Sequence, residues 1–245
     1  ADGYQALQYE TNGFYTVQAI DAATRTITIN SLEEYLNLNA LNDKWVEFFS
    51  NGQGKEYSNY APQNGGKGTD FYYKWGWTIK LNTDIDLKDV TALVPTNLES
   101  FGYFDGNGHT IKNATITTTS DAGLFRAGHA AVKNLNLYNI KVNGGNDAPV
   151  GILTSDCHAS VDNITIVNSS VEGGKYVGGA VGYGYCDVTN CTLTNCVVKG
   201  SYKFGGVIGY ICASNENLGN VDNNTLTDCT VEWTGNYSSG KDTVV

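Results

Sequence analysis

The chain has almost no proline, no methionine, and cysteines that form no metal-binding motif. Only 3 of its 245 residues are proline, whereas 29 are glycine. This combination suits many tight turns between strands that keep their amide donors. The six cysteines lie at wide, irregular spacings without a Cys-x-x-Cys pattern, so the sequence indicates no zinc site of that kind. An oxidising compartment is permitted but not required.

Positive charge and long apolar runs are also scarce. The chain has 15 Lys and Arg against 25 Asp and Glu, a formal net charge of −10, and its only arginines are Arg25 and Arg126. Such a chain repels phosphate backbones and anionic lipid, so nucleic-acid binding is not expected. No apolar run approaches the ~20 residues of a membrane-spanning helix. Because the chain begins at Ala1 and lacks methionine, we expect a mature exported protein, extracellular or at the cell surface.

A short phrase recurs five times in the second half of the chain: an apolar residue, any residue, Asn, and a β-prone run. It occupies residues 111–116, 132–137, 161–166, 188–193 and 221–226. Repeats 20 to 50 residues long are typical of stacked-coil architectures. Asn tolerates the left-handed backbone conformation, and stacked amides can hydrogen-bond along an axis. We therefore expect one structural Asn ladder, formed by Asn113, Asn134, Asn163, Asn190 and Asn223.

Two further patterns repeat in step with this phrase. Glycine-rich runs precede the later copies, and a second polar residue follows five positions after the phrase Asn, at Asn139, Asn168, Asn195 and Asp228. Each repeat thus supplies about three short strands, and pairing each strand with its counterpart ~4.8 Å along the axis satisfies the backbone. The predicted fold is all-β, a single-stranded, right-handed parallel β-helix. A leucine-rich-repeat horseshoe is disfavoured because its dense Leu pattern is missing.

The first third of the chain differs in composition and is predicted to be a cap. Residues 1–78 would contain strands, a helix at about 31–49 with a possible break near 37–42, and an irregular loop at 51–70. Ser31 and Glu34 form a possible capping box for that helix. The β-helix would span 79–235, and 236–245 would be a polar tail. A helix over the end of a solenoid would cover open strand edges and the apolar core.

The segments Gly178-Gly-Ala-Val-Gly182 and Gly205-Gly-Val-Ile-Gly209 resemble the GLUG-type repeat of bacterial surface proteins. The stretches 81–87 and 104–111 contribute to the resemblance, which covers roughly residues 79–235. It implies a β-helical module used in adhesion or surface binding, and it brings no catalytic residues. Two features depart from the pattern: residues 121–126 and 149–153 lack the doubled glycine, and Asn224 replaces an apolar residue.

The preferred functional hypothesis is a non-catalytic adhesin that recognises glycan or a surface protein. It would be monomeric and would need no cofactor. Aromatic side chains on a polar loop can stack on sugar rings, and they also anchor protein interfaces. The candidate ligand-binding residues are Tyr57, Tyr60, Tyr72 and Trp75, whereas Trp77 is expected in the core. A purely structural spacer within a larger surface protein is another possibility.

The alternative hypothesis is a carbohydrate-active enzyme, either a polysaccharide lyase or a glycoside hydrolase. A glycosidase needs two carboxyl groups facing one cleft, and the candidates are Asp84, Asp86 and Asp105. Asp86 and Asp105 also suit ordinary turn and cap hydrogen bonds, as Asx residues often do. A lyase would need a basic group, and neither arginine lies near an acidic cluster in the sequence.

Histidine and cysteine suggest two further sites. His129 and His158 each precede a phrase Asn by five residues, so they could stack and begin a metal site, although no third ligand is evident. Cys196 and Cys229 occupy the same repeat position, where neighbouring coils bring α-carbons within disulfide range. Stacked reduced thiols in the core are an equal alternative there. Cys191 matches Leu135 and Ile164 and is expected to be a core residue.

Overall fold

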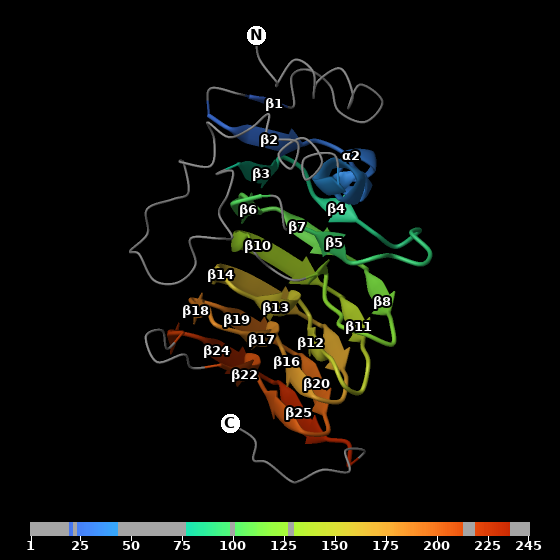
Figure 1. Cartoon of the computed structure of the whole chain (residues 1–245), viewed down its shortest axis with the longest axis vertical. Coiled ribbons are helices and arrows are strands. Elements are labelled where there is room, and N and C mark those ends of the chain that lie inside the picture. The colour runs from blue at the N-terminus through green and yellow to red at the C-terminus, as the bar shows by residue number, and fades with distance from the viewer. Residues whose placement is uncertain are drawn as a thin grey trace.

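The computed structural model describes residues 20–21, 24–43, 77–98, 101–126, 130–212 and 219–235. Over these residues the chain forms a parallel β-solenoid of about five turns, and Figure 1 shows strands from successive stretches of sequence lying one below another. The predicted parallel, stacked architecture is confirmed. The coils differ in sequence but keep their strands in register, because each strand pairs with its counterpart one coil away.

Four sheets run along the solenoid. The largest has the order β1 (Ile20–Asp21), β2 (Thr26–Ile29), β3 (Thr78–Leu81), β6 (Tyr103–Asp105), β10 (Ala131–Tyr138), β14 (Ser160–Val167), β18 (Asp187–Thr189) and β23 (Val221–Asp222). Attached to it are β4 (Ile85–Asp86), β7 (Thr110–Lys112), β19 (Thr192–Thr194) and β24 (Thr225–Thr227). Among the described strands, only β1 and β2 pair antiparallel, whereas β2 and β3 already pair in parallel.

The other three sheets complete each coil. The second contains β8 (Thr115–Thr117), β11 (Lys141–Asn143), β15 (Ser170–Glu172), β20 (Val197–Gly200) and β25 (Thr230–Trp233). The third contains β12 (Pro149–Gly151), β16 (Tyr176–Gly178) and β21 (Lys203–Gly205). The fourth contains β5 (Thr96–Asn97), β9 (Phe125–Arg126), β13 (Thr154–Cys157), β17 (Val181–Gly184) and β22 (Ile208–Ile211).

The core is a set of apolar columns parallel to the solenoid axis. Val142, Val171 and Val198 are register partners in successive coils and are all buried. Leu135 pairs with Ile164 in another fully buried column. Burying one such side chain contributes about 1.5–3 kcal/mol, so every added coil lengthens the core. The alternation of buried and exposed positions along each strand follows from the two-residue period of β structure.

The predicted helical region of the cap is interrupted at one point. Helix α2 (Leu32–Leu36) ends at Asn37, at the edge of the range in which a break was expected, and residues 38–43 are helical again. The Ser31 side chain accepts a hydrogen bond from the Glu34 amide, and the Glu34 carboxylate accepts one from the Asn30 amide. This arrangement differs from an ideal capping box because the returning bond reaches one residue further back. Residues 44–49 of the predicted helix lie outside the described part.

Asn side chains form two columns, not the single ladder that the sequence predicts. Asn163 donates to Asn134, and Asn223 donates to Asn190, in the first column. The prediction that Asn113 belongs to this first column is wrong. Strand pairing places Asn113 beside Asn139, whose side-chain amide donates to the Asn113 side-chain oxygen across 2.9 Å. The second column therefore contains Asn113, Asn139, Asn168, Asn195 and Asp228, and every member has φ between 52° and 61°.

The first column also departs from pure Asn stacking. Asn134 donates to the Asp105 carboxylate across 3.1 Å, because the strand pairing places Gly106 at the position equivalent to Asn134. Asn190 donates to Asp162 across 2.7 Å. Left-handed geometry at these bends is inexpensive for Asn but costly for most residues. The recurring Asn thus marks the point where each coil turns.

The single glycine that ends each doubled-glycine segment allows two sheets to meet backbone to backbone. A Cβ added to Gly182 would lie 2.5 Å from the Val150 amide nitrogen, and one added to Gly209 would lie 2.5 Å from the Val177 amide nitrogen. Side-chain atoms cannot occupy that space. Glycine is therefore required where β17 and β22 pack against β12 and β16, and the sharp bend that follows β16 depends on it.

Candidate functional site: a tyrosine cluster

Five tyrosines gather on one lateral face, where the third and fourth sheets meet. We call Tyr176, Tyr183, Tyr185, Tyr202 and Tyr210 the tyrosine cluster. All five are partly exposed. Tyrosine combines a flat apolar ring with a polar hydroxyl, a combination enriched at binding interfaces.

Strand register positions the cluster. Tyr183 in β17 is paired directly with Tyr210 in β22, and Tyr176 in β16 is paired with Lys203 in β21. The glycines at the bend between β16 and β17 hold these two columns close together. Side chains from two sheets and two neighbouring coils can therefore make ring contacts.

The rings form a compact set with one stacked pair at its centre. The Tyr176 and Tyr210 centroids are 5.0 Å apart with an interplanar angle of 17°, and Tyr183 lies 5.4 Å from Tyr176 and 5.7 Å from Tyr210. Tyr185 meets Tyr183 edge to face at 5.5 Å, and their hydroxyls are hydrogen-bonded at 2.8 Å. These separations are typical of favourable aromatic pairs. The cluster is thus organised before any ligand binds.

Basic groups border the cluster. Lys203 Nζ lies 4.0 Å from the Tyr210 ring centroid, and Lys175 Nζ lies 5.2 Å from that of Tyr176. The His158 ring is 5.5 Å from Tyr185, and its Nε2 contacts the Asp156 carboxylate at 3.0 Å. Each ammonium group is therefore within cation–π range of a ring, and a locally positive rim occurs on a chain that is acidic overall.

Cys212 joins the cluster from the end of β22. Hydrogen bonds from the Tyr183 and Tyr185 hydroxyls lower the pKa of the Cys212 thiol. Burial, followed by the contact with Cys212, raises the pKa of Tyr183. The pKa of Tyr185 is raised as well, chiefly by its contact with Cys212, so the hydroxyls of Tyr183 and Tyr185 remain protonated at neutral pH.

The disulfide differs from the predicted one. Cys157 and Cys186 are bonded, with their α-carbons 5.8 Å apart. Cys196 and Cys229 are free, which contradicts the predicted bond and agrees with the alternative of stacked thiols. Each of these two thiols instead donates to a backbone carbonyl. Burial raises the pKa of Cys196 to about 11, and Cys191 is a fully buried core residue as predicted.

The candidate catalytic carboxylates are occupied by structural hydrogen bonds. Asp84 accepts from the Thr110 amide at 3.0 Å and lies 3.1 Å from His109 Nδ1. Asp86 accepts from the Asn113 amide group at 2.8 Å. These bonds lower the pKa of both carboxyls, with the Thr110 amide the main cause at Asp84 and Asn113 the main cause at Asp86.

Asp105 has an equivalent structural role. It accepts from the amides of Asn107 and Asn134 and lies 3.6 Å from Lys133 Nζ. Asp86 and Asp105 therefore hold the first rung of each Asn column, as the turn-and-cap interpretation expects. A glycosidase acid, by contrast, needs a raised pKa, and Asp84 and Asp86 show the opposite shift.

The remaining predicted site residues are only partly covered by the described residues. Tyr57, Tyr60, Tyr72 and Trp75 lie outside them, as does His129. His158 is described and contacts Asp156 and Tyr185. Within the described ranges, no group of three or more His, Cys, Asp and Glu side chains is arranged to hold a metal ion. Trp77 is completely buried, as expected.

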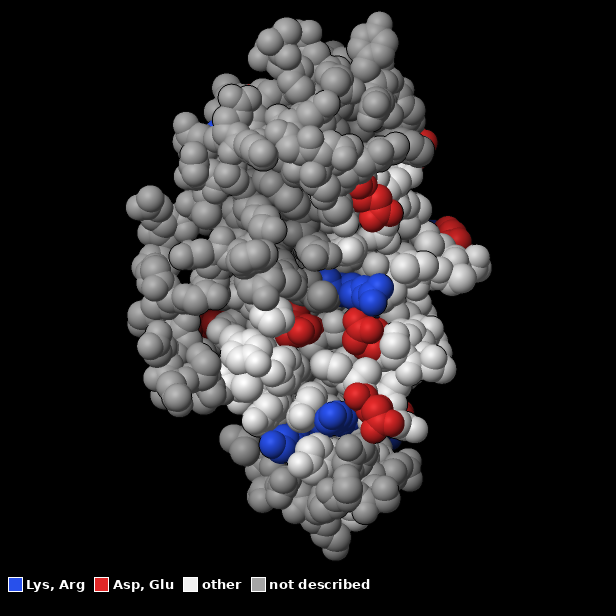
Figure 2. All heavy atoms as spheres, in the orientation of Figure 1, with Lys and Arg blue, Asp and Glu red and all other residues white. Residues whose placement is uncertain are grey.

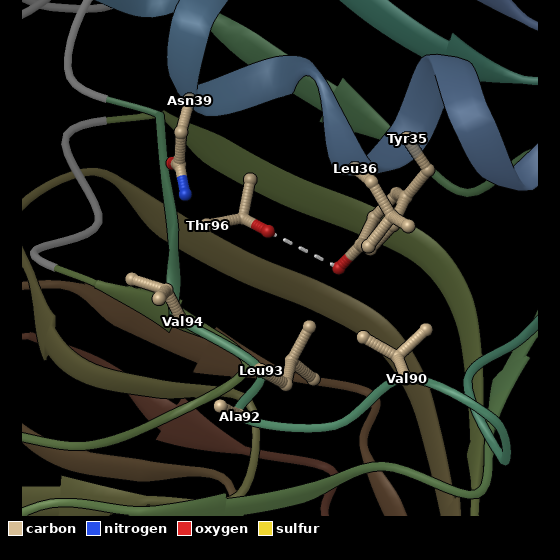
Figure 3. Close-up of a pocket in the computed structure, with 8 residues that line it drawn as sticks. All are labelled: Tyr35, Leu36, Asn39, Val90, Ala92, Leu93, Val94 and Thr96. Carbon is tan, nitrogen blue, oxygen red and sulfur yellow. Dashed lines mark hydrogen bonds between the residues drawn. The ribbon is translucent and has the colours of Figure 1, made fainter.

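A small hollow beside the cap helix is a weaker candidate (Figure 3). Its volume is about 200 Å³, and it lies between α2 and the segment leading into β5. Its polar groups already have partners: the Tyr35 hydroxyl bonds to Thr96, and Asn39 bonds to the backbone at Pro95 and Asn97. The hollow therefore offers apolar walls without a charged or free polar group to orient a ligand.

A larger hollow lies between the loops that precede β9 and β12. Its volume is about 520 Å³, and it is lined by Thr118, Thr119, Ser120, Gly144, Gly145, Asn146, Asp147 and Ala148. The lining is polar but contains no aromatic side chain. Thr118 and Ser120 hydroxyls bond to each other at 3.0 Å. Without a flat apolar surface, this hollow lacks the main feature of a sugar-stacking site.

Charges of both signs are mixed among the described residues of the visible face. Figure 2 shows acidic and basic side chains interspersed there. Oppositely charged neighbours include Lys112 with Asp86 at 3.7 Å and Lys199 with Glu232 at 3.2 Å. In the described part of the chain, no helix has the length and hydrophobicity needed to span a bilayer.

Sequence reasoning missed the tyrosine cluster, although a signal was present. Tyr183 and Tyr210 are 27 residues apart, the same separation as Asn163 and Asn190. Equal spacing in a solenoid places two residues in the same column. Each of these tyrosines also directly follows a doubled-glycine segment, at Gly182 and at Gly209, so the glycine repeat itself carried the signal.

The chain matches no protein-family model. It is 36% identical over 85 residues to Halomucin of Haloquadratum walsbyi, a match that covers 33% of this chain and about one hundredth of that protein's length. A crystal structure of a "putative immunoglobulin A1 protease" from Bacteroides ovatus aligns with a TM-score of 0.45 and 13% identity, covering 89% of this chain and 80% of that one.

Proposed function

We propose that the chain is a non-catalytic, exported or cell-surface binding module that recognises a glycan through the tyrosine cluster. The observation that carries the proposal is the preformed set of tyrosine rings bordered by Lys175 and Lys203. A sugar ring has an apolar face of C–H groups that packs on an aromatic ring, and its hydroxyls accept hydrogen bonds from ammonium and phenol groups. The cluster supplies both kinds of contact on one lateral face.

The elongated scaffold supports the same proposal. A solenoid presents equivalent positions at regular intervals along its axis, which suits contact with an extended polymer. Tyr183 and Tyr210 are one coil apart and could contact neighbouring sugar units. Lys175 and Lys203 would attract a glycan that carries carboxylate or sulfate groups. This attraction would be local, since the net negative charge of the chain as a whole repels anions.

The carboxylates support a binding function over catalysis. Asp84, Asp86 and Asp105 are held by the hydrogen bonds that order the first turns of the solenoid, and the pKa values of Asp84 and Asp86 are lowered. They are suited to accept hydrogen bonds rather than to donate a proton to a glycosidic oxygen.

The test is a glycan array followed by affinity measurement of the best ligand. Tyr210→Ala removes the central ring and should weaken binding roughly tenfold, equal to about 1.4 kcal/mol, whereas Tyr210→Phe retains the ring and most of the affinity. Tyr138→Ala is the matched control, since Tyr138 is 45% exposed on β10, away from the cluster. Lys203→Gln should weaken binding of acidic glycans more than of neutral ones.

Two results would contradict the proposal. One is release of reducing ends or unsaturated products from the bound polysaccharide, which would show catalysis. The other is glycan binding that Tyr210→Ala leaves unchanged, which would place the site elsewhere on the molecule.

A further inference from the structure

The last described coil leaves four strand edges with a partner on one side only. In the described part of the chain, β22, β23, β24 and β25 pair with β17, β18, β19 and β20 and with no strand beyond them. Figure 1 shows β22, β24 and β25 at the C-terminal end of the stack. Such an edge presents backbone N–H and C=O groups in the spacing that another strand would use.

The apolar core columns continue to this end, and their last described side chains are exposed there. Val188 and Leu193 are fully buried, but their register partners one coil later, Val221 and Leu226, are 40% and 42% exposed. Trp233 is 51% exposed in β25. These positions are apolar because of their place in the repeat, and they would become buried only if another coil covered them.

The Asn columns have a direction that continues past the last coil. Where the ladder bonds are formed, the Asn amide donates to a side-chain oxygen of the preceding coil, as Asn163 does to Asn134 and Asn195 does to Asn168. Asn223 donates to Asn190, and among the described residues nothing donates to its own side-chain oxygen.

The second column ends in a carboxylate with the same chemistry as the group that begins it. Asp228 has the left-handed backbone of its column, with φ of 54°. A carboxylate only accepts hydrogen bonds, and Asp86 uses this property to receive the Asn113 amide. Asp228 therefore supplies, at the last described position of this column, the kind of acceptor that a further Asn would need.

We propose that the C-terminal end of the solenoid is a docking surface for a further parallel β-coil that carries Asn at both ladder positions. Its strands would pair with β23, β24 and β25, its apolar residues would cover Val221 and Leu226, and its two Asn amides would donate to Asn223 and Asp228. This is strand addition to an open sheet edge, in which main-chain bonds supply affinity and side-chain positions supply specificity. It does not depend on the proposed glycan site.

The probe is a labelled peptide with the sequence of residues 160–173, which contains both ladder residues and no cysteine. We expect saturable binding and increased protection of β24 and β25 amides from hydrogen exchange. The control peptide carries Asn163→Ala and Asn168→Ala and should bind at least tenfold more weakly.

Two variants of the protein locate the surface. Leu226→Lys and Asp228→Lys should each weaken peptide binding at least tenfold. Glycan binding should be retained in both, since neither residue is part of the tyrosine cluster. Absence of peptide binding, or equal binding to the control peptide, would overturn the proposal. Concentration-dependent self-association that Leu226→Lys abolishes would also overturn it, because a second copy would then be the occupant.

Discussion

At the scale of single residues, the turns of this solenoid depend on asparagines in left-handed backbone conformation. Nine members of the two columns, together with Asn107, have positive φ. The side-chain amide then has two roles, because it fits this conformation and bonds to the coil above. Gly would also fit the left-handed conformation, but it has no side chain to bond to the neighbouring coil. Gln has an amide, but it could make that bond only from a different backbone geometry.

Substitution of Asn139 should separate these two roles. Asn139→Ala introduces left-handed strain of about 1–2 kcal/mol and removes the bond to Asn113, so we expect a loss of roughly 2 kcal/mol in unfolding free energy. Asn139→Gly removes only the bond and should cost about 1 kcal/mol. Urea unfolding followed by circular dichroism measures both. Equal losses for Ala and Gly would show that backbone strain has no part.

At the scale of elements, certain strand positions require glycine as strictly as the core positions require an apolar side chain. Gly182 and Gly209 face the backbone of a neighbouring strand, so the clash from an added Cβ cannot be relieved by rotating a side chain. The doubled-glycine motif thus encodes contact between two sheets, and that contact is what brings the tyrosines together.

Gly209→Ala should therefore lower stability by about 1–3 kcal/mol, the usual range for overpacking, and should disturb the tyrosine cluster. Gly206→Ala is the matched control, because its new Cβ would meet mainly the Leu226 side chain, which is 42% exposed and can move. Thermal unfolding and near-ultraviolet circular dichroism of the tyrosines measure the two effects. A control variant as unstable as Gly209→Ala would contradict the backbone-contact explanation.

At the scale of the whole molecule, stability is distributed coil by coil. Each coil contacts chiefly its neighbours, so opening can begin at an end and proceed inward. The N-terminal end is covered by α2 and β1, whereas the described strands at the other end have one open side. The two ends therefore should differ in local stability.

Amide hydrogen exchange should reveal this gradient. We expect hydrogen-bonded amides of β24 and β25 to exchange at least about tenfold faster than those of β10 and β14, which are paired on both sides. Mass spectrometry of the exchanging protein measures the rates by segment. Uniform protection across all strands would show that the solenoid opens as one cooperative unit.

The repeat period and the β-prone phrase were sufficient to predict the solenoid, but not which column Asn113 belongs to. Asn113 was assigned to the wrong column because the phrase around it copies the later phrases, although pairing sets it against Asn139. The first column begins instead at Asp105 and Gly106, where the phrase is absent. Local similarity identifies a type of turn, and only strand pairing decides which turns are stacked.

Side-chain sites were harder to predict for a related reason. Cys157 and Cys186 come together because Cys157 ends β13 and Cys186 follows the neighbouring strand β17, and their sequence positions share no motif. The tyrosine cluster combines residues from two sheets and two coils, and it depends on the glycine contact that closes the bend between β16 and β17. The carboxylate roles were predictable from short-range turn chemistry, because Asp86 and Asp105 bond within their own turns as well as across coils.

Among the connections that lead from the fourth sheet back to the first, one is longer than the others. Three positions separate the end of β13 from the start of β14, and likewise β17 from β18, but ten separate the end of β22 from the start of β23. Pairing is nevertheless retained between β18 and β23. Natural variants could therefore acquire or exchange whole inserted segments at this corner while the scaffold remains intact, and a protein engineer could graft a foreign loop there for display.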